Sequence, residues 1–263
     1  MDTKKIALYN LDIASHKARF ESFVNQYITI DSHYLLKVKY EHTQHVLDNV
    51  KMILQYGEFS NIVSRGALLA ALYHDIGRFP QFIKWRTFND WESINHAILS
   101  VQLLKKYGFL KEEIKSIQKV CLSAIILHNR KLLPKQLDNK IQLTAKILRD
   151  ADKLDILRVV SLHVDGTLQK EEVTLFLKDE PLKWNHKIMQ DILEGRTPNY
   201  LDLIYLNDFK MIILSWIREL TFPITKRLFA SSSNISVLLD TLPNCNTFKK
   251  IRELFTKMIE ESL

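Results

Sequence analysis

The chain of 263 residues is 46% hydrophobic and 25% charged, with a formal net charge of +7 at pH 7. This hydrophobic content is enough for a sizeable core, and the lack of repeats and Gly/Ser linkers favours one globular domain, residues 1 to 263, over a disordered chain. Lysines and arginines are scattered along the sequence, so the charge is compatible with an anionic partner but does not favour a nucleic-acid-binding module.

The N-terminal residues Met1 to Lys5 have no signal-peptide apolar core, and no run in the sequence approaches the roughly 18 apolar residues that a membrane-spanning helix needs. Cys121 and Cys245 are too few for a disulfide framework and have no Cys-x-x-Cys spacing. We therefore expect a cytoplasmic protein without a membrane partner and without structural zinc held by thiolates.

The first two predicted helices differ in what their apolar faces contain. Residues 6 to 30 have helical spacing and nothing that suggests chemistry. In the next helix the apolar stripe from Leu35 to Ile53 passes through His42, where an aliphatic residue is expected. His45 lies one turn further along, so a His-x-x-His metal pair is one interpretation, and a hydrogen-bonded core histidine is the other.

Residues 60 to 76 are predicted to form a helix that is apolar on every side and capped by Ser60. Such a helix is buried, so it delivers the adjacent His74 and Asp75 into the interior, and Gly77 lets the chain turn away. A buried carboxylate is costly unless a cation or a set of hydrogen bonds compensates it. Beside an imidazole that cation is expected to be a metal ion, and an ion pair with a neighbouring arginine is the alternative.

Residues 78 to 95 form a predicted connection rich in aromatic and basic residues, which suits a flat anionic ligand such as a nucleotide. Packing of these aromatic rings on the core is the alternative. Ser93 is the expected N-cap of the following helix, which ends at Gly108. This helix has His96 in its first turn, where the helix dipole favours the neutral imidazole that ligates metals.

Two further helices carry polar residues at positions of their apolar faces. In the helix that ends at His128, apolar residues recur every three or four residues, and His128 occupies the next position of this repeat. In the helix of residues 141 to 159, Asp152 and Asp155 occupy positions of the apolar repeat. A hydrogen bond explains any one buried polar residue, but five helices that each direct a histidine or aspartate inward favour a shared site.

The order of His42, His74-Asp75 and the segment Ala-Asp-Lys-Leu-Asp around Asp152 resembles the HD superfamily of metal-dependent phosphohydrolases, over about residues 35 to 160. The motifs His-Asp-Ile-Gly-Arg-Phe, Thr-Phe-Asn-Asp and Arg-Asp-Ala-Asp-Lys-Leu-Asp are similar to those of a group of bacterial HD-domain proteins whose substrates are mostly unassigned. The resemblance implies an all-α fold, the HD-domain helical bundle.

The resemblance also implies a set of residues that bind one divalent ion: His42, His74, Asp75 and Asp152. Members with histidines at the positions of His96 and His128 bind a second ion there, and the aspartate that matches Asp75 bridges the two ions. Because this sequence has the fuller set, we expect two ions. Histidine and aspartate ligands suit Mn, Fe, Co, Ni or Mg. Asp155 is expected to orient one of the ligand histidines.

The implied activity is hydrolysis of a nucleotide or a related phosphomonoester or phosphodiester by a metal-activated water. We expect Asp75, Arg78 and Lys153 to take part in catalysis, and Arg78 and Lys153 also to contact the phosphate. Arg130 and Lys131 are further candidate substrate contacts, although surface cations near a helix end are the simpler interpretation.

Beyond residue 165 the resemblance fades, and residues 165 to 263 are expected to form additional helices on the HD core. The predicted elements are a helix from Leu201 to Leu220, another that begins at Pro223 and a last amphipathic helix from Thr247 to Glu260. No residue in this part suggests a role.

Two alternatives to a phosphohydrolase come from other functional classes. A di-iron oxygenase on an HD scaffold uses the same metal ligands. A nucleotide-binding regulatory HD protein has no turnover, but the intact ligand set disfavours this alternative. The expected partner of the phosphohydrolase is a small anionic phosphoester or nucleotide, and the sequence is compatible with a homo-oligomer.

Overall fold

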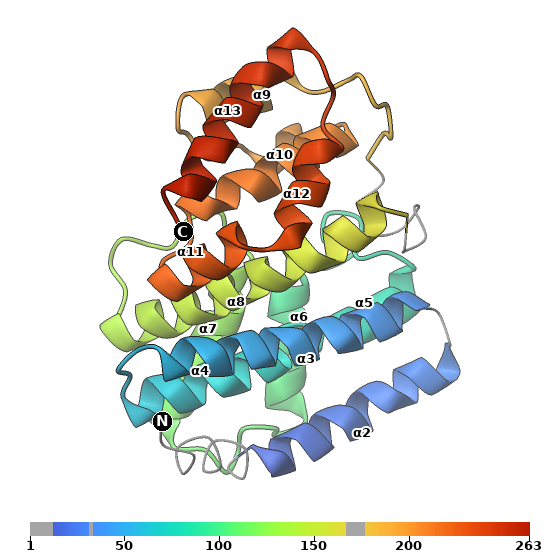
Figure 1. Cartoon of the computed structure of the whole chain (residues 1–263). Coiled ribbons are helices and arrows are strands. Elements are labelled where there is room, and N and C mark those ends of the chain that lie inside the picture. The colour runs from blue at the N-terminus through green and yellow to red at the C-terminus, as the bar shows by residue number, and fades with distance from the viewer. Residues whose placement is uncertain (1–12, 32–33, 167–176) are drawn as a thin grey trace. The chain divides into compact units, whose positions relative to one another are not determined.

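The structure is a computed structural model that describes residues 13–31, 34–166 and 177–263 (Figure 1). Its regular elements in these ranges are helices, so the predicted all-α fold is confirmed. Contacts divide the chain into two compact units, Met1–Asp152 and Lys153–Leu263. The division falls inside one helix, earlier than the predicted end of the HD core near residue 160. The expectation of a single domain stays a prediction.

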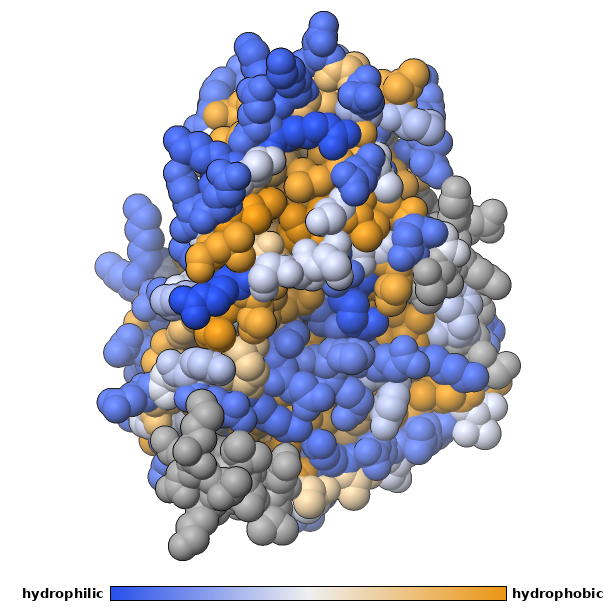
Figure 2. Space-filling view, viewed as in Figure 1, coloured by the Kyte–Doolittle hydropathy of each residue, from blue (hydrophilic) through white to orange (hydrophobic). Residues whose placement is uncertain are grey.

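The first unit contains helices α2 to α7 and the first half of α8. Their bounds are α2 (Ala14–Ile30), α3 (Tyr34–Gln55), α4 (Asn61–Tyr73), α5 (Arg78–Trp85), α6 (His96–Lys106), α7 (Lys115–His128) and α8 (Asn139–Val164). Helix α3 is amphipathic, since Lys37, Glu41, His45 and Asp48 recur on its exposed side. Figure 2 shows this face of α3 as mostly hydrophilic.

Helix α4 is the central element of the first unit, because it contacts α2, α3 and α7. All its residues from Val63 to Tyr73 except Arg65 are buried, as the uniformly apolar sequence predicts. The Ser60 side chain caps its first turn by accepting a hydrogen bond from the Val63 amide. A Cβ at Gly66 would overlap Val120 Cγ2, so this glycine permits the close packing of α4 on α7.

Gly77 is the last residue of a turn between α4 and α5, and the predicted connection from residue 78 is wrong in its first half. Helix α5 begins at Arg78, and Gly77 has φ −67°, an ordinary helical value. Its lack of a side chain matters for another reason, because a Cβ would lie 2.6 Å from the His96 carbonyl oxygen and 2.8 Å from the Ser100 amide nitrogen. The Gly77 amide also donates to Ser100 Oγ, which donates to the His74 carbonyl oxygen. Gly77 therefore lets α6 approach the end of α4.

Helix α6 is capped by Asn95 rather than by the predicted Ser93. Asn95 Oδ1 accepts from the Ile98 amide at 3.1 Å, which makes His96 the first residue of the helix. Ser93 Oγ instead accepts from Gln81 Nε2 at 2.8 Å. Gly108 follows the helix with φ 64°, the left-handed conformation that its predicted role requires.

The second unit contains the rest of α8 and the C-terminal helices. They are α9 (His186–Leu193), η1 (Tyr200–Asp202), α10 (Leu206–Ser215), η2 (Trp216–Arg218), α11 (Pro223–Ala230), α12 (Ser233–Asp240) and α13 (Asn246–Glu260). The predicted helix over residues 201–220 is therefore divided into three shorter elements. The predicted start at Pro223 is confirmed, and so is the last helix, whose bounds differ by one residue.

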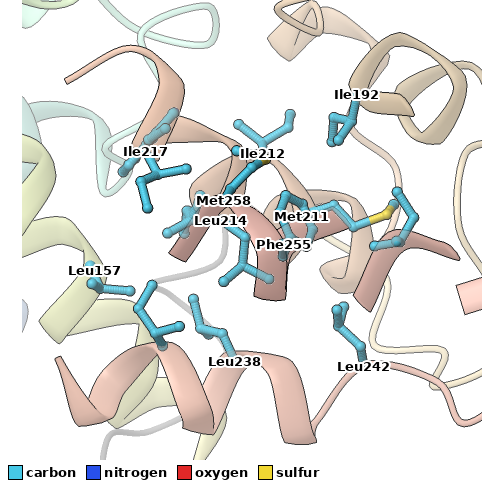
Figure 3. Packing of buried hydrophobic residues seen from close by; sticks show 14 of the residues in the cluster. Leu157, Ile192, Met211, Ile212, Leu214, Ile217, Leu238, Leu242, Phe255 and Met258 are labelled. Carbon is cyan, nitrogen blue, oxygen red and sulfur yellow. The ribbon is translucent and has the colours of Figure 1, made fainter. Parts of the chain in front are cut away.

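A hydrophobic core of its own holds the second unit together (Figure 3). Ile212 of α10, Leu238 of α12 and Phe255 of α13 are buried in it. Leu157 of α8 points into the same core. Among the helices of the described ranges, none combines the length and the apolar character that crossing a membrane requires.

Gly66→Ala is expected to destabilise the protein by about 1 to 3 kcal/mol, because overpacking a core costs this much. At an unconstrained helical position the same change stabilises by about 1 kcal/mol. Urea unfolding followed by circular dichroism measures the difference. In the background of Val120→Ala, which removes the overlapping methyl group, the substitution is expected to be neutral or stabilising. Equal costs in both backgrounds would contradict the steric explanation.

Candidate metal centre

All six predicted metal ligands belong to the first unit, where three helix ends and the middle turns of two other helices bring them together. The ligands are His42 in α3, His74 and Asp75 after α4, His96 at the start of α6, His128 at the end of α7, and Asp152 in α8. The side chains of the first five are at most 4% exposed and that of Asp152 is 14% exposed. The cluster is thus almost closed to solvent, with Asp152 at its more open side.

One oxygen of Asp75 faces the first group of ligands. Asp75 Oδ2 lies 3.7 Å from the Nε2 atoms of both His42 and His74. His42 Nε2 is also 3.3 Å from His74 Nε2 and 3.1 Å from Asp152 Oδ1. The ligand atoms of His42, His74 and Asp152 all lie within 4.8 Å of one another, a spacing that suits one metal ion.

The other oxygen of Asp75 faces a second group. Asp75 Oδ1 lies 3.4 Å from His96 Nε2 and 4.0 Å from His128 Nε2, and the two imidazole nitrogens are 3.1 Å apart. The ligand atoms of His74, Asp75 and His128 also lie within 4.8 Å of one another. A single carboxylate therefore has one oxygen on each side, between two sets of nitrogen ligands.

Both histidines of the second group are neutral at pH 7. Burial lowers the pKa of His96 to about 4, and the nearby Arg78 guanidinium acts in the same direction. Burial also lowers the pKa of His128 to about 4, with His74 as a further cause. Neutral imidazole is the form that binds metal ions.

Hydrogen bonds fix which nitrogen of these two rings carries the proton. His96 Nδ1 donates to Asp90 Oδ2 at 2.6 Å, and His128 Nδ1 donates to the Ile125 carbonyl oxygen at 2.6 Å. In a neutral imidazole the other nitrogen then has only a lone pair. The 3.1 Å contact between the two Nε2 atoms brings two lone pairs together, which a cation beside them would stabilise. The donor set thus fits a metal ion.

The carboxylates of the cluster are ionised. Burial alone raises the pKa of the Asp75 carboxyl, but Lys39 and the neighbouring imidazoles hold that pKa well below its usual range. For Asp152 burial again opposes ionisation, and the hydrogen bond with His42 nevertheless lowers the pKa. Two negative charges in a buried cluster favour the binding of cations.

Arg78 lies at the cluster, as predicted for a substrate contact. Its Nε is 3.6 Å from Asp75 Oδ1 and is buried without a hydrogen-bond acceptor. Its Nη1 donates to Gln81 Oε1 at 3.0 Å, to the Phe88 carbonyl oxygen at 2.6 Å and to Asp90 Oδ1 at 2.9 Å. The guanidinium group is therefore held by three acceptors on one side while its Nε faces the cluster.

Asp90, to which no role was assigned from the sequence, contacts both Arg78 and His96. Its carboxylate binds both the Arg78 guanidinium and the His96 ring. The hydrogen bond from His96 and the charge of Arg78 outweigh burial and lower its pKa to about 2. Asp90 precedes the helix, so helical spacing carried no signal for it. The motif Thr-Phe-Asn-Asp, which ends at Asp90, was the available clue.

Lys39 and Arg149 were also missed. Lys39 Nζ donates to Asp75 Oδ2 at 2.8 Å from a position three residues before His42 on α3. Arg149 Nη1 donates to the carbonyl oxygens of Leu127 and His128 at 3.2 and 3.1 Å, which stabilises the C-terminal end of α7. Neither residue gave a signal in the sequence, because Lys39 is partly exposed and Arg149 resembles any surface cation of a helix.

The remaining predicted cations lie elsewhere. Lys153 belongs to the second unit, where Nζ pairs with Glu219 and lies 5.5 Å from the centroid of the Trp216 ring. Arg130 and Lys131 are exposed, and their backbone carbonyls accept hydrogen bonds from Arg149. The substrate contacts assigned to these residues stay predictions.

Two other polar residues that the sequence singled out are His45 and Asp155. His45 is exposed, so it does not form a pair with the buried His42. Asp155 is buried in the second unit and accepts from Arg158 Nε at 2.6 Å. Its expected role in orienting a ligand histidine stays a prediction.

Comparison with known proteins gives one family and no individual relative. The family model of the HD domain matches residues 40–157. No curated protein and no solved structure matches the chain. The matched range contains all six residues of the candidate metal centre, and this part of the chain belongs to the HD-domain superfamily.

Proposed function

We propose that the protein is a phosphohydrolase that depends on two divalent metal ions and acts on a nucleotide or a related phosphomonoester or phosphodiester. The observation that carries the proposal is the placement of Asp75, whose two oxygens face separate groups of imidazole nitrogens. Membership of the HD-domain superfamily supports the same activity. A carboxylate between two nitrogen sets is the arrangement that a bridging ligand needs.

The residues divide between the two ions according to these distances. His42, His74 and Asp152 would hold the first ion together with Asp75 Oδ2. Asp75 Oδ1 would bind the second ion together with the two remaining histidines, His96 and His128. Nitrogen and oxygen ligands without thiolates suit Mn, Fe, Co, Ni or Mg.

A pair of divalent ions supplies water activation near neutral pH and neutralises charge on a phosphoryl group. The protein contributes preorganisation. Asp90 keeps the proton of His96 on Nδ1, so Nε2 is available as a ligand. Arg78 presents a buried Nε–H without an acceptor beside Asp75, and a guanidinium group in this position suits a phosphoryl oxygen. Arg78 is therefore the substrate contact that the proposal includes.

A nucleotide substrate is supported by the residues around the connection before α6. The Phe88 ring centroid lies 5.7 Å from Arg78 Cζ. Trp91 in the same connection is 82% exposed and precedes the ligand His96 by five residues. An exposed indole can stack on a nucleobase, which is a favourable contact for any base.

A screen of nucleotides and generic phosphoesters with Mn, Mg, Co and Ni, each run anaerobically and in air, tests the reaction type. Phosphate release that is independent of oxygen is expected. Consumption of oxygen with one substrate would instead assign the centre to an oxygenase. Tight nucleotide binding without any product under all conditions would favour the regulatory alternative.

Asp75→Ala is expected to remove both ions and abolish turnover, because each ion loses the carboxylate oxygen that faces it. Elemental analysis gives the metal content, and circular dichroism should show unchanged helical content. Asp48→Ala, an exposed aspartate of α3, is the matched control and should keep both ions. Full metal occupancy in Asp75→Ala would eliminate the proposed centre.

His128→Ala is expected to lose about one ion per chain and most of the activity, because the second ion would lose one of its two remaining imidazole ligands. His42→Ala should instead disturb the first ion, and the exposed His45→Ala serves as a control. Metal content and phosphate release are measured on the same preparations. If the wild type binds one ion, and His128→Ala keeps it with near-normal turnover, the second ion is absent and His128 has another role.

A further inference from the structure

Lys39 places a positive charge at the carboxylate that joins the two ligand groups. Its Nζ lies 2.8 Å from Asp75 Oδ2, the oxygen that also faces His42 and His74. The Lys39 side chain is 22% exposed, whereas that of Asp75 is 4% exposed. The ammonium group therefore extends from the more accessible side of α3 to the edge of the buried centre.

A lysine at this point opposes the binding of metal ions. It competes for Asp75 Oδ2 as an internal counterion, and its charge repels any divalent cation at the adjacent ligands. A site built only to hold metal would gain affinity by losing this residue. The position of Lys39 therefore calls for a role that its positive charge serves directly.

A second cation lies at the other oxygen of Asp75. Arg78 Nε is 3.6 Å from Oδ1 while Lys39 Nζ is 2.8 Å from Oδ2, so the two cations flank one carboxylate. Phe88 lies near both, with its ring centroid 5.7 Å from Lys39 Nζ and 5.7 Å from Arg78 Cζ. An aromatic ring attracts a nearby cation without neutralising its charge, so Phe88 favours a positive charge at both positions.

Both cations have N–H groups that could donate hydrogen bonds to a ligand. An ammonium group has three N–H donors, and the hydrogen bond to Asp75 uses one of those of Lys39. Arg78 uses Nη1 for Gln81, Phe88 and Asp90, but its buried Nε has no acceptor. A tetrahedral oxyanion beside Asp75 would supply the acceptors that these donors lack.

We propose that Lys39 and Arg78 together form a cradle for the phosphoryl group, in which Lys39 contacts one phosphoryl oxygen and Arg78 another. This inference rests on the proposed phosphohydrolase function and assigns to Lys39 the part of a substrate-binding residue. Each cation lies at an oxygen of Asp75 that also faces candidate metal ligands, so a phosphoryl group held by both cations would lie beside the proposed metal centre.

The proposal predicts effects of opposite sign for Lys39→Met. Metal affinity should rise by about threefold to tenfold, because a competing and repelling charge is removed, and phosphate affinity of the metal-loaded protein should fall by about tenfold. A lysine that merely supports the structure would weaken both when replaced. Opposite changes in metal and phosphate affinity would therefore indicate a substrate-binding lysine, and parallel losses a structural one.

The measurements are Mn²⁺ affinity of the metal-free protein, by competition with a chelator, and affinity of the Mn²⁺-loaded protein for inorganic phosphate, by calorimetry. Lys37→Met, at an exposed position of the same helix, is the matched control and should leave both affinities within about twofold. Lys39→Arg keeps the charge and should recover part of the phosphate affinity. If Lys39→Met lowers the helical content, Lys39→Gln replaces it.

Unchanged phosphate affinity in Lys39→Met, or a parallel loss of metal and phosphate affinity, would overturn the cradle. These results leave the proposed function intact if the wild type hydrolyses phosphoesters. Conversely, phosphate binding that depends on Lys39 in a protein without hydrolytic activity would refute the proposed function and support the cradle. The two proposals therefore fail in distinguishable ways.

Discussion

The buried negative charge of Asp75 is the constraint on which the first unit depends. An ionised carboxylate inside a core is stable only among groups that compensate it. Helix α4 fixes its position, because this apolar helix is buried almost completely and ends immediately before His74 and Asp75. Four other helices supply imidazoles and cations to the same place. The groups that compensate the charge of Asp75 are therefore also the residues of the candidate site.

The position of each histidine in its helix determines what holds its ring. His74 and His128 lie at C-terminal helix ends, where carbonyl groups have no partner within the helix, and each ring donates to the carbonyl three residues earlier. His96 begins a helix, where free carbonyls are missing, so an acceptor must come from outside. Asp90 supplies it. This difference explains why one ligand needs a separate carboxylate and the other two do not.

Periodicity predicted the inward positions of His42 and His128 because the repeat of apolar residues directly reports which side of a helix is buried, and both are buried. It could not indicate Lys39, since a partly exposed lysine on an amphipathic helix is normally solvated. Helix α5 was missed because eight residues have little helical stability of their own, and buried side chains such as Phe79 and Phe82 stabilise this one by packing. Tertiary contacts, which a single sequence does not display, decide such cases.

Helix α8 belongs to both units, because the boundary between them falls inside this helix. Asp152 is the last residue of the first unit, and the same helix continues without a break to Val164 in the second. A fragment cut at the boundary would end at the predicted ligand Asp152, on a fraying turn whose carbonyls have lost their hydrogen bonds. Residues after Asp152 in α8 therefore help to hold the predicted ligand Asp152 in its helical position, because their amide groups belong to the same continuous helix.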